Sequence, residues 1–489
     1  MGELGSIHVA SAGRPEADLL AVGCFDGEAP AVDGLDEANR QAVGRLAARP
    51  GWRGKEDHLA QTEAGPEGPV VSLYGLGART DFSYARVARW LSRLAEDARQ
   101  SGARRMAAVL PSHAETSGAA ADRLLRALAL AGYRFDRFLG DGEKGNRVER
   151  LAVVPPAGEE AAYQAALSGV EKVAAAIVYA RDLANSPANE ATPTWMEERA
   201  RELAAGRNFD ISVLRADELR ALGMGGLLAV GAGSAHEPRM IRVRFGDRGP
   251  RVALVGKGVT FDTGGISIKQ AADMDEMKYD KSGACAVLAA VRAAADLDLP
   301  VRLSVYTPFA ENMLSAEAYR PSDIVRCYNG KTVEITNTDA EGRMILADAL
   351  AWAAEEKPDA IVELSTLTGG IIVALGHAAA GLYTSDDGLA GELTAASEAA
   401  GERLWRLPLY PEYLEEMKGT HADLRNSAGR WGGANTAAAF LSQFVGDVPR
   451  WAHLDIAGVA NVKADRAACS GATGFGVATL VGWLRELTR

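Results

Sequence analysis

Four carboxylates in the second half of the chain could bind divalent cations. Asp262 lies in the glycine-rich segment VGKGVTFDTGGISIK, and Asp280 directly precedes an apolar helical run. Asp339 and Glu341 lie in TNTDAEGRM, between a strand and a helix that we expect from about Met344. Loops at the carboxyl ends of strands converge in an open α/β sheet, so we expect these groups to lie close together. Crowded carboxylates raise one another's pKa unless cations neutralise them, which predicts a divalent metal site.

The types of the available ligands limit the metal. Oxygen ligands with one or two nitrogen donors suit Mn²⁺, Mg²⁺ or Zn²⁺, and two ions that share carboxylates could hold a hydroxide at neutral pH. The seven histidines form no HExxH motif and the cysteines form no CxxC motif, so a zinc site of histidines or thiolates is not indicated. We interpret the scattered cysteines as small buried side chains. They are Cys24, Cys285, Cys327 and Cys469.

Each of these segments also has a purely structural interpretation. Lys257 and Asp262 could form a surface ion pair, and Asp280 could cap a helix. Asp339 and Glu341 would suit the dipole of a helix start. The glycines around Lys257 could cradle a phosphate, but neither GxxxxGK[ST] nor GxGxxG occurs. The four carboxylates taken together favour the metal site over these separate interpretations.

Strand-like and helical runs alternate along the chain, which predicts an α/β fold that positions these groups. In the first third, the expected strands are Leu19–Val22, Val70–Leu73 and Met106–Leu110, and the expected helices are Tyr84–Gln100 and Ala119–Ala131. In the second part, the expected strands are Val252–Val255, Val301–Tyr306, Thr332–Thr336, Ile361–Ser365 and Ala452–Ile456. Polar or glycine-rich loops follow these strands, and the site should lie there.

The clearest domain boundary lies near residue 160. The strand-like Leu151–Val154 is followed by a Pro-Pro-Ala-Gly turn and by an alanine-rich helix that ends at NSPANEATP. We therefore predict an N-terminal α/β domain over residues 1–158 and a connecting helix over 159–184. A larger α/β domain that carries the candidate site would span residues 185–489.

The composition excludes several classes of protein. Apolar residues make up 47% of the 489 residues and charged residues 24%, as in folded rather than disordered chains. The net charge of −12 works against binding to nucleic acid or to anionic membranes. The first residues lack the pattern of a signal peptide, and no stretch approaches about 20 uncharged apolar residues. We therefore expect a cytoplasmic protein that does not engage membranes.

Taken together, the motifs resemble those of the cytosolic leucyl aminopeptidase family, the M17 type of metallopeptidase. NTDAEGR at residues 337–343 is the family's signature heptapeptide, and VGKGVTFDTGGISIK and MKYD match its two upstream ligand segments. Further matches are NSPANEATP, MGGLLAVGAGSAHEPRMI, STLTGG, HLDIAG and GATGFGV. The resemblance implies a smaller N-terminal macrodomain-like α/β domain and a larger C-terminal α/β catalytic domain with a mixed central sheet.

The resemblance also implies a di-metal-dependent aminopeptidase with a defined set of ligands. One ion would be held by Asp262, Asp339 and Glu341. The second would be held by Lys257, Asp262, Asp280 and Glu341. Lys257 would bind as a neutral amine, because the adjacent cation depresses its pKa. The ions would be Mn²⁺ or Zn²⁺, with Mg²⁺ or Co²⁺ as further possibilities.

In the implied reaction, the peptide's free amino group binds one ion, its first carbonyl binds the other, and a bridging hydroxide attacks that carbonyl. Lys269 would bind the substrate and stabilise the oxyanion. Arg343 would hold a bicarbonate that relays the proton to the leaving amine, since a planar guanidinium suits a planar anion.

The remaining implications concern substrate and assembly. Leu367 would offer its carbonyl to the free amine, and a methionine-lined pocket would favour leucine or methionine at the peptide's N-terminus, with broad acceptance. The pocket candidates are Met277, Thr366, Gly369 and Ala460. For Met277, ordinary core packing is nearly as good an interpretation. Relatives form homohexamers, as dimers of trimers, so we expect a hexamer that acts on peptides.

Two residues depart from the family pattern, and two other functions compete with the peptidase. Lys281 adds positive charge beside Asp280, and Glu363 stands where an aspartate is common. Some members of the family bind DNA as accessory proteins, but the net charge and the intact ligand set favour the enzyme. A two-metal phosphoesterase would use the same carboxylates and would leave Lys257 and the peptidase motifs unexplained.

Overall fold

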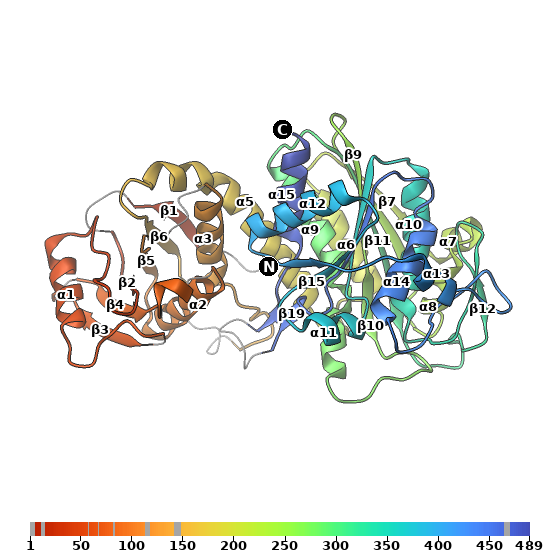
Figure 1. Ribbon diagram of the computed structural model, residues 1–489, viewed down its shortest axis with the longest axis horizontal. Coiled ribbons are helices and arrows are strands. Elements are labelled where there is room, and N and C mark those ends of the chain that lie inside the picture. The colour runs from red at the N-terminus through yellow and green to blue at the C-terminus, as the bar shows by residue number, and fades with distance from the viewer. Residues whose placement is uncertain are drawn as a thin grey trace. The chain divides into compact units, whose positions relative to one another are not determined.

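The computed structural model describes residues 5–10, 15–56, 58–66, 68–81, 84–112, 118–140, 148–463 and 470–489. The chain forms two compact units, Met1–Val178 with Lys463–Ser470 and Tyr179–Val462 with Gly471–Arg489. The division falls within helix α5, Glu160–Asn185 (Figure 1). This helix spans almost the residues expected for the connecting helix. The domain limits at 158 and 185 stay a prediction.

The first unit is built on a mainly parallel sheet. Its strands are β1 (Ser6–Val9), β2 (Leu19–Cys24), β3 (Leu59–Glu63), β4 (Val70–Gly75), β5 (Arg105–Val109) and β6 (Arg150–Val154). Its helices besides α5 are α1 (Glu37–Ala47), the short η1 (Arg79–Asp81), α2 (Tyr84–Ser101) and α3 (Gly118–Ala131). The strands lie in the order β1-β6-β5-β2-β4-β3, and β3 runs antiparallel to β4. The strands and helices expected in this part are confirmed within one or two residues.

The second unit is built on a larger, mixed sheet. Its strands are β7 (Phe209–Leu214), β8 (Arg239–Phe245), β9 (Arg251–Gly256), β10 (Gly258–Asp262), β11 (Arg302–Asn312), β14 (Ala360–Ser365), β15 (Ala380–Tyr383), β16 (Leu404–Arg406) and β18 (Trp451–Asp455). Their order is β16-β15-β18-β14-β9-β11-β8-β7, with β10 paired to β11. The central strands β18, β14, β9 and β11 are parallel, whereas β7, β8 and β15 run antiparallel to neighbours. The predicted α/β class with a mixed central sheet is therefore confirmed.

Helices cover this sheet, and small strands lie beside it. The helical elements are α6 (Pro193–Ala204), α7 (Ala216–Leu222), α8 (Gly225–Gly231), η2 (Met274–Lys281), α9 (Ser282–Asp296), α10 (Glu341–Glu355), α11 (Gly369–Leu375), α12 (Asp387–Ala400), α13 (Pro411–Glu416), α14 (Gly433–Leu441), η3 (Ser442–Phe444) and α15 (Val477–Leu487). The smaller sheets contain β12 (Ile324–Arg326), β13 (Thr332–Glu334), β17 (Leu424–Arg425), β19 (Asn461–Val462) and β20 (Gly471–Ala472). The strand expected at Thr332–Thr336 belongs to a small sheet and not to the central one.

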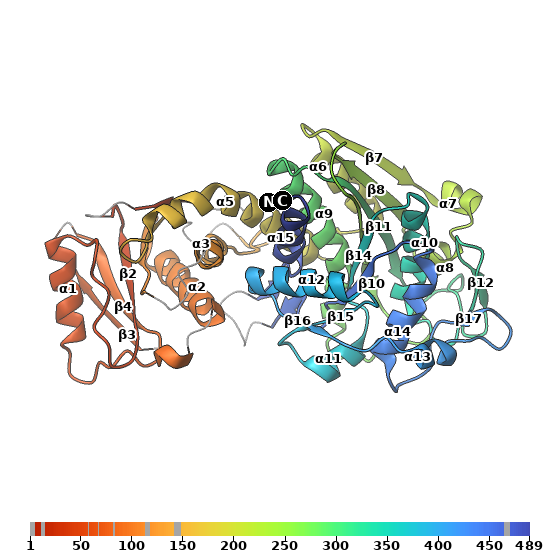
Figure 2. The ribbon, with the colours of Figure 1, turned by 45° about the horizontal axis from the view of Figure 1, so that its top comes forward.

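Two alanine-rich helices sandwich the centre of the large sheet. α9 packs on one face and α10 on the other, and both are buried along nearly their whole length (Figure 2). Small side chains let these helices approach the strands closely, so that almost no solvent reaches the layer between them. The core on the α10 side includes Ala253 and Val255 of β9 and Tyr306 of β11. This rigid layer carries the candidate site at the carboxyl ends of its strands.

Cys24, Cys285 and Cys327 are buried free thiols, as expected for small buried side chains. Cys469 lies outside the described residues. None of the helices in the described ranges combines the length and the apolar character that crossing a bilayer would require.

Candidate metal centre

Lys257 occupies the one-residue break between β9 and β10. Its backbone N–H donates to the Leu364 carbonyl of β14 at 3.0 Å, and its carbonyl accepts from the Ala284 N–H of α9 at 2.8 Å. Its Nζ lies 2.7 Å from Asp280 Oδ1 and 2.8 Å from Glu341 Oε1. The side chain is 2% exposed. The interpretation of Lys257 and Asp262 as a surface ion pair is therefore wrong: the lysine is buried and contacts other carboxylates.

Asp280 is the second-last residue of the 3₁₀ helix η2, and its carboxylate points into the same space. Its Oδ1 accepts hydrogen bonds from Lys257 Nζ and from the Thr366 hydroxyl, both at 2.7 Å. The N-cap residue of α9 is Lys281, and in the described part of the chain its side chain makes no capping hydrogen bond. The interpretation of Asp280 as a helix cap is therefore wrong, because its carboxylate faces side chains instead of the helix backbone.

Asp262 and Glu341 enter the site from a strand end and a helix start. Asp262 is the last residue of β10, and its Oδ2 lies 2.8 Å from Lys269 Nζ. Glu341 is the first residue of α10, three residues before the predicted start at Met344. The apolar periodicity begins only at Met344, because the first turn contains glutamate, glycine and arginine. The negative charge of Glu341 is favourable in the first helical turn, because the helix dipole is positive there. This agrees with the structural interpretation of Glu341 given above.

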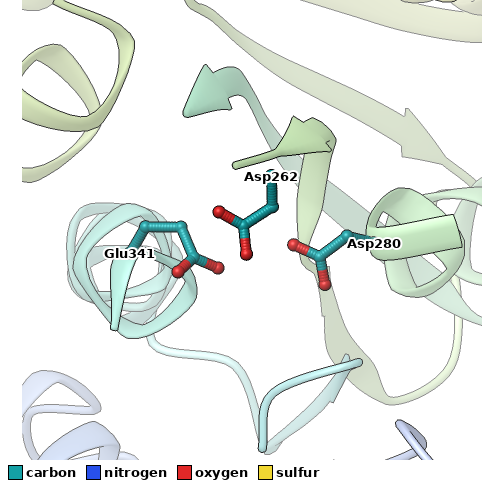
Figure 3. A group of neighbouring side chains, drawn as sticks. All are labelled: Asp262, Asp280 and Glu341. Carbon is teal, nitrogen blue, oxygen red and sulfur yellow. The ribbon is translucent and has the colours of Figure 1, made fainter. Parts of the chain in front are cut away.

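These side chains form one cluster. The carboxylates of Asp262, Asp280 and Glu341 point toward one another from β10, η2 and α10, with one oxygen of each within 4.8 Å of the others (Figure 3). Lys269 Nζ joins Asp339 to them, because it lies 2.5 Å from Asp339 Oδ1 as well as close to Asp262. The residues predicted as ligands thus lie close together, beyond the carboxyl ends of β10 and β14. From the sequence, we expected them at the carboxyl ends of strands.

Burial and mutual repulsion raise the pKa of three of the carboxyl groups. Burial raises the pKa of Asp262 and raises that of Asp280 well above its usual value, against the attraction of the lysines. Burial and the charge of Glu341 raise the pKa of Asp339 to about 6. The pKa of Glu341 falls to about 2, since the lysine charges outweigh its burial. Two ammonium groups therefore do not balance four carboxylates, of which three are buried.

The two lysines respond to the same field. Burial by itself would lower the pKa of each amine. The charges of Asp280 and Glu341 outweigh this effect at Lys257, and those of Asp262 and Glu341 outweigh it at Lys269, so that both pKa values rise. Each ammonium thus bridges carboxylates that would otherwise repel one another.

The hydrogen bonding of two carboxylate oxygens in the cluster shows whether the residues fit a metal ion. Asp280 Oδ2 and Glu341 Oε2 are buried and, within the described part of the chain, have no hydrogen-bond partner. Buried carboxylate oxygens normally have partners, and such atoms without one are expected where a cation binds. The donor set of carboxylates with one amine fits divalent ions of the Mn²⁺ and Zn²⁺ type.

Arg343 lies in the first turn of α10 and is 7% exposed. Its Nη1 donates to the Asn426 carbonyl at 2.7 Å, and its Nε finds no hydrogen-bond partner among the residues that the structure describes. Burial lowers its pKa to about 10, although Glu341 and Asp455 oppose this effect. No carboxylate of the described ranges lies within ion-pair distance of it, so the guanidinium can accept an anion.

Comparison with known proteins identifies the family. The sequence profile of the cytosol aminopeptidase family, catalytic domain, matches residues 178–481, and the profile of that family's N-terminal domain matches residues 21–141. The chain belongs to the cytosol aminopeptidase family. Members of this M17 family are metal-dependent peptidases, and the chain is accordingly a hydrolase of this class. The match at residues 21–141 covers the part in which the sequence motifs are faintest.

Individual relatives agree with this assignment to the cytosol aminopeptidase family. A probable cytosol aminopeptidase of Roseiflexus castenholzii is 46% identical over 429 residues, which cover 86% of this chain and 87% of the relative. One from Geobacter sp. is 42% identical and covers 96% of each chain. The solved structure of the bottromycin maturation enzyme BotP in complex with Mn superimposes with a TM-score of 0.85 at 35% identity, over 97% of this chain and 100% of that one.

Three of the candidate substrate residues, Thr366, Leu367 and Gly369, follow β14. The Thr366 carbonyl accepts a hydrogen bond from Lys257 Nζ at 2.9 Å, and the Leu367 N–H donates to Asp455 Oδ1 at 3.1 Å. Gly369 is exposed, and apart from its own helix and chain neighbours no described residue has an atom within 4 Å of where its Cβ would be. Met277 is half-buried in η2, and Ala460 is buried after β18. Their roles stay predictions.

Lys281 and Glu363, the two residues that depart from the family pattern, are both buried and both make polar contacts. Lys281 is fully buried, and its Nζ donates to the Ala184 carbonyl at 3.2 Å and the Ser186 carbonyl at 3.0 Å. Its charge therefore faces backbone carbonyls at the end of α5. Glu363 is also fully buried and contacts His453 Nδ1 on the neighbouring strand β18. That ring stacks on Tyr383 of β15, with ring centroids 5.6 Å apart.

Sequence reasoning missed two polar residues beside the site, Asn312 and Asp455. The expected strand ended at Tyr306, whereas β11 continues to Asn312. Pro308 interrupts the strand-like run, and proline is normally a sign against a central strand. Asp455 was included in an expected strand, with no role. Its position as the last residue of β18, at a carboxyl end in the sheet, could have marked it.

Proposed function

We propose that the protein is a di-metal aminopeptidase that releases the N-terminal residue of peptides. The observation that carries this proposal is a pair of buried oxygens, Asp280 Oδ2 and Glu341 Oε2, beside the buried amine of Lys257. Neither oxygen has a hydrogen-bond partner among the described residues. One ion would be held by Asp262, Asp339 and Glu341. The other would be held by Lys257, Asp262, Asp280 and Glu341. Asp262 and Glu341 would thus be shared.

Charge balance supports two ions over one. Four carboxylates carry four negative charges, which two divalent cations neutralise. Lys257 then no longer needs its proton to offset Asp280 and Glu341, and its lone pair becomes available as a ligand. Lys269 has a more exposed side chain, at 23%, and would keep its charge.

The ions would activate a water molecule and polarise the peptide carbonyl. The remaining steps belong to the chain's own residues. The Lys269 ammonium would stabilise the negative charge that develops on the carbonyl oxygen. Arg343, which has no carboxylate partner in the described ranges, would hold bicarbonate as the group that passes the proton to the leaving amine.

Substrate selection would take place at the turn after β14. The Leu367 carbonyl would accept a hydrogen bond from the substrate's free amine, while Met277, Thr366, Gly369 and Ala460 would line the pocket for the first side chain. Gly369 is exposed and has no side chain, which would leave room for a substrate side chain, and the half-buried Met277 would contribute an apolar surface. Leucine and methionine would fit best, with broad acceptance.

We further propose Mn²⁺ or Zn²⁺ as the ions, with Mg²⁺ and Co²⁺ as weaker alternatives. BotP, solved in complex with Mn, supports Mn²⁺. The protein would act in the cytoplasm on peptides, as a homohexamer arranged as a dimer of trimers, without membrane or nucleic-acid partners. The names of the cytosol aminopeptidase relatives and the net charge of −12 support this setting.

Hydrolysis of leucine p-nitroanilide tests the proposal. Metal-stripped protein is expected to be inactive and to regain turnover when Mn²⁺ is added. Acetyl-leucine p-nitroanilide, which lacks the free amine, should not be cleaved, and p-nitrophenyl phosphate reports on the two-metal phosphoesterase. Turnover of the acetylated compound or of the phosphate ester, or no turnover of leucine p-nitroanilide by the Mn²⁺-loaded protein, would contradict the proposed reaction.

A further inference from the structure

Asn312 is a buried amide that touches two of the segments carrying candidate ligands. It is the last residue of β11 and is 1% exposed. Its Nδ2 donates to Asp262 Oδ1 at 2.8 Å and to the Thr338 carbonyl at 3.1 Å. One side-chain amide thus joins the end of β10 to the loop directly before Asp339, although Asp262 and Thr338 lie far apart in sequence.

The amide also determines which oxygen of Asp262 faces the cluster. Asp262 Oδ1 accepts from Asn312 Nδ2 and from the Gly264 N–H at 2.9 Å. With both donors on Oδ1, the other oxygen, Oδ2, is directed to Lys269. A carboxylate held by two N–H groups on one oxygen cannot rotate freely about its last bond, so its orientation is set before any ligand binds.

We propose that Asn312 is a positioning residue for metal binding, which holds Asp262 and the loop before Asp339 in the arrangement that the ions require. The inference rests on the di-metal site of the proposed function. The amide is suited to this work because it donates without adding charge. An acidic side chain at this position would place a fifth negative charge in the cluster.

The contacts separate this role from a purely structural one. The Asn312 backbone carbonyl accepts hydrogen bonds from the Thr263 N–H and hydroxyl, at 3.0 and 2.9 Å, and any residue at this position keeps that carbonyl. The Thr338 carbonyl also accepts from the Tyr319 hydroxyl at 2.8 Å. Each acceptor that the amide serves therefore keeps a second donor when the amide is removed. The fold should survive, while Asp262 Oδ1 loses one of its two donors and the carboxylate is held less firmly.

The test compares Asn312→Leu with the unsubstituted protein in Mn²⁺ titrations of metal-stripped protein by calorimetry. Leucine has nearly the same size and shape and no donor. We expect Mn²⁺ to bind about 10- to 100-fold more weakly, as for other partners that orient metal ligands. Excess Mn²⁺ should recover much of the hydrolysis of leucine p-nitroanilide. Asn39→Leu is the matched control, since Asn39 of α1 is also 1% exposed and lies in the first unit; its Mn²⁺ affinity should not change.

The outcomes distinguish the two proposals. If the unsubstituted protein binds no Mn²⁺, the proposed function fails. If it binds Mn²⁺ and Asn312→Leu binds equally tightly, only the positioning role is wrong. Asn312→Ala serves as a second variant if leucine does not fit, and circular dichroism with urea unfolding reports folding. If neither variant folds, Asn312 is needed for folding, and the positioning proposal is wrong.

Discussion

Lys257 and Lys269 lie in one acidic cluster, and the difference in their burial suits them to different roles. Lys257 is almost completely buried and is held on both sides of its backbone by hydrogen bonds to β14 and α9. Lys269 follows a glycine-rich loop, and its side chain is 23% exposed. A buried amine surrounded by ligand oxygens can give up its proton to a metal ion. A partly exposed amine keeps its charge and can reach a substrate.

Lys269→Ala tests this division at the level of a single residue. Removal of an oxyanion donor of this kind costs about 3 to 4 kcal/mol, so we expect kcat for leucine p-nitroanilide to fall about 100- to 1000-fold. Mn²⁺ binding should persist, because the proposed ligands remain. Lys418→Ala is the control, since Lys418 is 61% exposed and pairs with Glu415. A loss of kcat below about tenfold would show that Lys269 does not stabilise the transition state.

At the scale of elements, the first turn of α10 is set directly against the break between β9 and β10. A Cβ on Gly342 would lie 2.5 Å from Lys257 Cε and 2.7 Å from its Nζ. The absence of a side chain at Gly342 is therefore what makes room for the Lys257 amine. Helix and strand together shape this ligand position, and neither does so alone.

Gly342→Ala should consequently disable the site while sparing the fold. Alanine favours a helix over glycine by about 1 kcal/mol, and the clash involves the flexible end of a lysine. The amine must move away from Asp280 and Glu341, so we expect the ion that Lys257 would bind to be lost and activity to fall at least tenfold, in line with the loss of a ligand. Gly391→Ala in α12 is the control, because within the described ranges nothing outside its own helix lies within 4 Å of its Cβ position. Two Mn²⁺ ions per chain at unchanged affinity in Gly342→Ala would contradict this reasoning.

At the scale of the whole molecule, the net charge disfavours nucleic acid as a partner, whereas the exposed apolar side chains favour association with other protein chains. A net charge of −12 opposes close approach of nucleic acid. Several large apolar side chains are nevertheless exposed on the second unit, among them Trp405 at 65%, Trp431 at 81% and Val373 at 89%. Aromatic side chains are enriched where chains associate, which suits the proposed assembly of identical chains.

Light scattering under conditions of activity tests this assembly. The proposed hexamer should have a mass of about six times the 51.5 kDa of one chain. The mass should remain stable when salt is raised if apolar contacts dominate the interfaces, because salt screens only the charged ones. A mass near 51.5 kDa for active protein would rule out the hexamer.

Much of the fold and of the candidate site could be predicted from local sequence. Strands β2, β4, β9 and β14 are short apolar runs bounded by polar residues or glycine, so their patterns are visible without tertiary contacts. Parts of two other elements were not predicted, for physical reasons. Pro308 hides the second half of β11, and the polar first turn of α10 carries no apolar periodicity.

Residue types and their periodicity were enough to establish which side chains are available as ligands, their order along the chain and the α/β class, because these are local properties. Three-dimensional packing was needed to establish that Lys257 is buried, that Asp280 faces it instead of capping a helix, and that Asn312 holds Asp262. These contacts join residues 23 and 50 positions apart. They depend on the order of the strands and on the close packing of α9 and α10, which no local pattern contains.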